Sequence, residues 1–94
     1  MGREREAAEM LALKALGWIA ARDDLLPAFL GATGASPDDV RRLATDGRFL
    51  GGVLDFLLSD EAWVLAFARD EGIAPDAALR ARAALPGGDV PHWT

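Results

Sequence analysis

The sequence predicts an all-α fold: a compact bundle of five or six short helices, with an ordered irregular C-terminal tail (residues 86–94) packed on it. Three observations predict this. Every apolar stripe has helical spacing, residues that start and stop helices recur along the chain, and no segment shows the alternating, β-branched pattern of a strand. The 94 residues, 51% of them hydrophobic, are enough for one core, so residues 1–94 are expected to form a single helical domain.

The first predicted helix covers roughly residues 3–22, a stretch of strong helix formers without proline. Its apolar residues fall on more than one side, with Leu11 and Trp18 on one side and Leu13 on another. A helix that is apolar nearly all round is either central in the core or shared with a partner. The sequence leaves both open: a central core helix, or a homo-oligomer formed through it.

Capping residues mark the next two helices. Asp23 or Asp24 is the expected N-cap of the second helix, and Gly34 is its expected left-handed terminator. Ser36 is the expected N-cap of a short third helix, with Pro37 at its first position, where the missing N–H costs little.

The sequence pattern of the second half of the chain predicts three more helices. Residues 46–72 contain two helices that meet at Ser59, and Ser59 is expected to cap the second of them. The last helix is expected to run from Pro75 to Leu85, with Leu79 among its apolar positions.

A pair of glycines, Gly51 and Gly52, lies inside the fourth predicted helix, beside Asp55 on its less apolar side. Glycine inside a helix reduces the stability of the helix by about 1 kcal/mol relative to alanine. We therefore expect that the fold needs the absence of a side chain at these two positions. Close approach of a neighbouring helix or of the tail is the reason that we predict.

Charge and composition exclude several classes of function. The net charge of −5 opposes binding to phosphate backbones, so no nucleic-acid partner is expected. The apolar run from Met10 to Ala21 is shorter than the about 20 residues that a membrane span needs, and Lys14 interrupts it, so no membrane partner is expected. Cysteine is absent, which excludes disulfides and zinc–thiolate sites and fits a cytoplasmic location.

No catalytic or metal-ligating residue is predicted, and no cofactor. A Ser–His–Asp triad is formally possible, but Ser36 and Ser59 both stand where helices need caps. The one histidine, His92, lies two residues from the C-terminus, and without cysteine a metal would have to rely on carboxylates.

The chain closes on PGGDVPHWT, which combines turn-forming residues with the aromatic area of Trp93. Termini are ordered only when they are tied down, so we expect the tail to dock on the bundle near Gly51 and Gly52. A partner-recognition motif and a disordered tail are the alternatives. The candidate interaction or pocket residues are Trp18, Gly51, Gly52, Asp55, His92 and Trp93.

Three blocks, LLPAFLGATGASPDDVRRLATD, FLGGVLDFLLSDEAWVLAFA and ARAALPGGDVPHWT, resemble a family of small bacterial proteins, domain of unknown function 3572. The resemblance covers nearly the whole chain, and LPGGDVPHWT is its most specific part. It implies a bacterial and cytoplasmic protein, and it carries over no catalytic residue, because the family has no assigned activity.

The function that these observations favour is a non-catalytic protein-interaction or assembly module, which acts through apolar surface of the first helix or through the tail. Its partner is another protein or further copies of the chain. The alternative is a small-molecule-binding protein, with a pocket between helices near Gly51, Gly52 and the tail.

Overall fold

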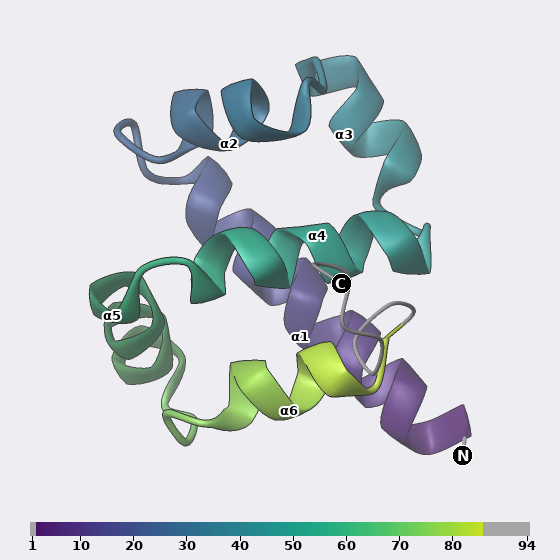
Figure 1. Ribbon diagram of the computed structural model, residues 1–94, viewed down its shortest axis with the longest axis vertical. Coiled ribbons are helices and arrows are strands. Elements are labelled where there is room, and N and C mark those ends of the chain that lie inside the picture. Colours follow the sequence, from purple (N-terminus) through teal and green to yellow (C-terminus); the bar gives the residue numbers. More distant parts are fainter. Residues whose placement is uncertain (1, 86–94) are drawn as a thin grey trace, which may run out of the picture.

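A computed structural model describes residues 2–85 of the chain (Figure 1). This part is all-α and contains no strand, which confirms the predicted fold class. Its six helices are α1 (Gly2–Ala20), α2 (Leu26–Thr33), α3 (Pro37–Leu43), α4 (Gly47–Leu58), α5 (Glu61–Glu71) and α6 (Ala77–Ala83). The predicted docking of the tail, with His92 and Trp93, lies outside the described residues.

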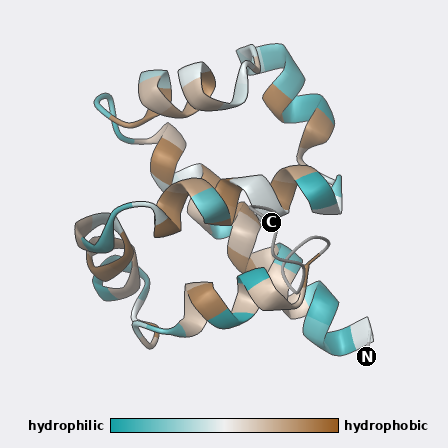
Figure 2. Cartoon of the chain, viewed as in Figure 1, coloured by the Kyte–Doolittle hydropathy of each residue, from teal (hydrophilic) through white to brown (hydrophobic). Residues whose placement is uncertain are grey.

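Helix α1 takes the central position that the sequence left open. It crosses behind α4 in Figure 1 and packs against α2, α4 and α6. The side chains that it buries are Ala8, Ala12, Ala15, Leu16 and Ile19. Its opposite face is exposed, and Figure 2 shows hydrophilic residues at its projecting N-terminal end.

Helix α2 begins later than predicted. Its N-cap is Leu25, which makes no side-chain capping hydrogen bond, so the prediction that Asp23 or Asp24 caps this helix was wrong. The reason is a turn between α1 and α2, closed by a hydrogen bond from the Leu25 N–H to the Arg22 carbonyl, which leaves both aspartates upstream of the helix. At the other end Gly34 is left-handed (φ 73°), as predicted.

Helix α3 begins at the predicted cap. The Ser36 hydroxyl accepts the Asp39 N–H at 3.2 Å, and the Asp39 carboxylate accepts the Ser36 N–H at 3.0 Å, which completes a capping box. That N–H of Ser36, together with the neighbouring Arg42 guanidinium, lowers the pKa of Asp39 below its ordinary value.

Two neighbouring residues cap the helix ends at the junction of α4 and α5. Ser59 ends α4, where its hydroxyl donates to the Phe56 carbonyl at 2.6 Å. Asp60 is the N-cap of α5, because its carboxylate accepts the Ala62 N–H at 2.9 Å. The prediction that Ser59 caps α5 was therefore wrong by one residue.

Helix α6 buries small residues rather than large ones. Ala78 and Ala81 are buried, whereas Leu79, predicted among the apolar positions of this helix, is 61% exposed. The helix also begins two residues after Pro75, at Ala77. Alanines allow α6 to lie close to α1, and this choice of face turns Leu79 to the outside.

The glycine pair is only partly explained by packing. Gly51 is buried, but a Cβ added at Gly52 would meet no atom within 4 Å. Close approach of another described helix is therefore not the reason for Gly52, which corrects that part of the prediction, whereas close approach of the tail lies outside the described residues. The same open space surrounds Gly17 in α1.

These glycines give a testable expectation. Gly17→Ala and Gly52→Ala should each raise the free energy of unfolding by about 0.5–1 kcal/mol, because alanine favours the helix and meets open space. Chemical denaturation followed by circular dichroism measures the change. Gly72→Ala is the opposing control: Gly72 has φ 67°, so alanine there should destabilise the protein. A loss of stability in both helix variants would contradict the packing described at these sites.

Candidate functional site

Trp18, a candidate site residue, is a structural contact between α1 and α5. Its indole N–H donates to the Asp70 carboxylate at 2.8 Å, and its ring meets the Phe67 ring edge-on at 5.7 Å between centroids. The Arg22 guanidinium lies 4.7 Å from the Trp18 ring centroid on the solvent side, a cation–π contact. These contacts account for the half-buried side chain without a ligand.

Asp55, the second charged candidate, connects α4 to α6. Its two carboxylate oxygens accept from Arg82 at 2.6 Å and 3.1 Å, a bidentate pair. The Asp55 side chain is 50% exposed and the Arg82 side chain only 13%, so the arginine is held against the bundle while the carboxylate faces solvent. The pair therefore links α4 to α6 through their side chains.

A double-mutant cycle should measure this pair. We expect Asp55→Ala to reduce the free energy of unfolding by about 1 kcal/mol. The bidentate geometry favours a strong contact, but water weakens it because the Asp55 side chain is 50% exposed. The coupling between Asp55→Ala and Arg82→Ala should be of the same size. A coupling energy of zero would show that the two helices are held by their apolar contacts alone.

The candidate site residues that the structure describes do not share one groove, and His92 and Trp93 lie outside the described residues. Trp18 lies against α5, whereas Asp55 faces α6, and Gly51 is buried in α4. None of them lines either of two grooves on the described part of the chain. The pocket expected near the glycine pair is therefore not among these grooves.

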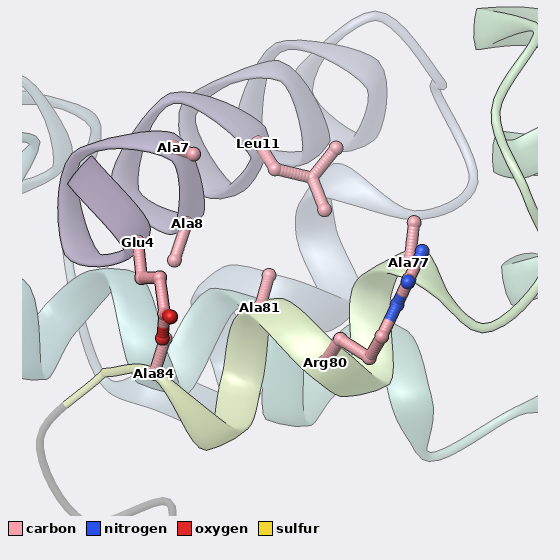
Figure 3. A pocket seen from close by; sticks show the side chains of 8 residues that line it. All are labelled: Glu4, Ala7, Ala8, Leu11, Ala77, Arg80, Ala81 and Ala84. Carbon is pink, nitrogen blue, oxygen red and sulfur yellow. The ribbon is translucent and has the colours of Figure 1, made fainter. Parts of the chain in front are cut away.

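The larger groove, of about 560 Å³, lies between α1 and α6, and we call it the α1–α6 groove (Figure 3). Five alanines and Leu11 form most of its wall, and Glu4 and Arg80 provide its charges. Figure 3 shows the Glu4 carboxylate at the Ala84 end and the Arg80 guanidinium towards Ala77, so the two charges stand at opposite ends of an apolar wall. The lining residues are Glu4, Ala7, Ala8, Leu11, Ala77, Arg80, Ala81 and Ala84.

The second groove, of about 380 Å³, lies between α5 and the start of α6, and we call it the α5–α6 groove. It contains two large side chains that the bundle leaves in solvent, Leu65 (49% exposed) and Leu79 (61% exposed). Glu61 and Asp76 are its charged residues. The complete lining is Leu58, Glu61, Val64, Leu65, Pro75, Asp76 and Leu79.

Sequence reasoning missed this second groove. Leu79 was predicted among the apolar positions of the last helix, and Leu65 was not singled out, although it lies off the helical face formed by Trp63, Val64 and Phe67. That offset was the available signal: a leucine outside the apolar stripe of its own helix is either exposed or in contact with another element.

Residues 2–85 contain neither a metal-binding cluster nor a membrane-spanning helix. No group of three or more histidine, cysteine, aspartate or glutamate residues there could hold a metal ion. None of the helices described is long and apolar enough to cross a membrane.

Fold and surface together define a small all-α bundle with two open grooves, one alanine-walled and one with exposed leucines. The chain matches the family model described as "Protein of unknown function (DUF3572)" over residues 5–88, and it belongs to this family. The resemblance seen in the sequence is thereby confirmed, while residues 89–94 of the tail lie beyond the matched range. Neither a curated protein nor a solved structure matches the chain.

Proposed function

We propose that the protein is a non-catalytic protein-interaction module and that the α5–α6 groove is its docking surface. The observation that carries the proposal is the pair of exposed leucines, Leu65 and Leu79, which stand on different helices and line one hollow. Isolated exposed apolar residues are ordinary on protein surfaces, but large ones gathered around a concave site favour binding.

The groove is a better candidate than the surface of α1. The other large exposed apolar residues of the described chain are Met10 (63%) and Leu13 (42%), both on the outer face of α1. Neither of them lines the α1–α6 groove or the α5–α6 groove. They offer contact area outside these two grooves, although their exposed fractions are similar to those of Leu65 and Leu79.

Because Met10 and Leu13 are exposed to a similar extent, they provide a matched control for an experiment that tests the α5–α6 groove. Tagged protein with Leu65→Ser and Leu79→Ser is expressed in the native host beside wild type and beside a Met10→Ser, Leu13→Ser variant. Co-purifying proteins are quantified by mass spectrometry. We expect a partner that wild type and the α1 variant retain and the groove variant loses. The partner is then purified and titrated against the same three proteins.

Two results would contradict the proposal. One is a partner that all three proteins retain equally; the other is a partner that only the α1 variant loses. Because all four substituted side chains are at least 42% exposed, we expect both variants to fold, and thermal melts confirm this before purification.

The α1–α6 groove favours a second candidate function, small-molecule binding. Its volume of about 560 Å³ lies within the range of ligand pockets, and its apolar wall carries opposite charges near its two ends. An Ala7→Leu variant narrows this groove from its exposed side. Native mass spectrometry of protein from the host should then show a bound small molecule in wild type that is lost in the variant. Protein that carries none would exclude this candidate.

Location in the bacterial cytoplasm is part of the proposal. It is supported by the absence of cysteine, which fits a reducing compartment. The proposed partner is accordingly a protein of the same compartment rather than nucleic acid, which the net charge of −5 disfavours.

A further inference from the structure

We infer that the α5–α6 groove takes a basic amphipathic segment of a partner protein: apolar side chains flanked by lysine or arginine. The inference rests on the proposed function of this groove and adds the chemistry of what binds there. Five of the seven lining residues are apolar, and the remaining two, Glu61 and Asp76, are acidic.

The two carboxylates lie at the N-terminal ends of the two helices that form the groove, one at each helix. Glu61 is in the first turn of α5, and Asp76 directly precedes α6. The Asp76 side chain makes no capping hydrogen bond, so capping does not explain why an aspartate occupies this position. Its one ion pair among the described residues is a long contact to Arg80, 3.6 Å, in which both side chains are more than half exposed. Such a pair is weak, so the aspartate can pair with a partner's cation instead.

The net charge of the whole chain also favours a basic partner. With a net charge of −5, the protein attracts basic segments and repels acidic ones before contact. Within the groove, Leu65 and Leu79 supply the apolar contact, and the carboxylates beside them select the flanking residues. A groove between two helices also suits an amphipathic helix, which lays its apolar face into such a site.

The test uses two synthetic probes and the full chain. The first probe is a short amidated helix-forming peptide with leucines on one face and lysines on its flanks, and the second has glutamates in place of the lysines. Isothermal titration measures each against wild type, against Leu79→Asp, and against a Glu61→Gln, Asp76→Asn variant. A variant with Asp23→Asn and Asp24→Asn makes the same change in net charge away from the groove, at exposed residues before α2.

We expect the lysine-flanked peptide to bind, more weakly as salt is added, and the glutamate-flanked peptide not to bind. Leu79→Asp and the Glu61, Asp76 variant should each weaken binding about tenfold or more, and the Asp23, Asp24 control should change it less than about threefold. Thermal melts of each variant separate a loss of binding from a loss of folding.

Four results would overturn the inference. They are no binding of the lysine-flanked peptide, equal binding of both peptides, equal weakening by both charge variants, or a dimer of the chain alone that Leu79→Asp dissociates. The proposed function fails separately: it falls only when the native partner does not depend on Leu65 and Leu79. If binding of the partner depends on these leucines but not on Glu61 and Asp76, the proposed function is supported and the inference of a basic segment is rejected.

Discussion

Replacing Phe29 by alanine is expected to lower the free energy of unfolding by about 3–5 kcal/mol, which is the usual cost of removing a buried phenylalanine. Phe29 is fully buried and is the one buried residue within α2. Its ring meets two rings of α4 edge-on, Phe49 at 6.0 Å and Phe56 at 5.3 Å between centroids. Phe56 in turn stacks on Trp63 of α5 at 5.0 Å, so the substitution opens a cavity at the centre of an aromatic cluster that joins three helices.

The loss is large for a domain of this size. Small domains unfold with about 5–15 kcal/mol, and each kcal/mol shifts the melting temperature by about 4–8 °C. A thermal melt should therefore show a decrease of more than about 10 °C. Phe29→Leu keeps most of the apolar volume and should lose less than half as much. A decrease of only a few degrees in Phe29→Ala would show that α2 is held to the bundle by other contacts.

Enlarging Ala12 to leucine is expected to destabilise the protein by about 1–3 kcal/mol, because added methylene groups in a packed core force side chains and backbone to shift. Ala12 is fully buried on the face of α1 that meets the rest of the bundle, between Ala8 and Ala15, which are also buried. The helices approach α1 closely because three of the five residues that it buries are alanines.

The neighbouring residue provides the control. Leu13 is 42% exposed on the outer face, so Leu13→Ala should change the free energy of unfolding by no more than about 0.5 kcal/mol. Denaturant titration of both variants compares the two faces of α1 directly. If Ala12→Leu were neutral and Leu13→Ala costly, the buried face of α1 would be the reverse of the one described.

Local signals were sufficient for the helices. The Ser36 cap and the left-handed Gly34 mark ends that depend on a few neighbouring residues, so the sequence predicts them well. The errors at Asp23, Asp24 and Ser59 arose where several adjacent residues could cap. Hydrogen bonds of the loop then decided among them.

The choice of buried face could not be read from local sequence. In α6 the burial of Ala78 and Ala81 instead of Leu79 depends on how closely α6 approaches α1, which is a property of the assembled bundle. The same holds for the α5–α6 groove, because Leu65 and Leu79 lie in different helices and come together only in the fold. For this reason the sequence predicted the fold class but directed attention to Trp18 and Asp55, which contact other helices instead of forming a pocket.

Site-specific photo-crosslinking in the native host tests the central claim, docking at the α5–α6 groove, most directly. A photoreactive phenylalanine analogue is placed at Leu65, at Leu79 and, as the reference, at Met10, three exposed positions on α5, α6 and α1. Docking in the groove predicts the same protein adduct from Leu65 and Leu79 and none of it from Met10. Adducts from Met10 alone, or different adducts from the two leucines, would contradict it.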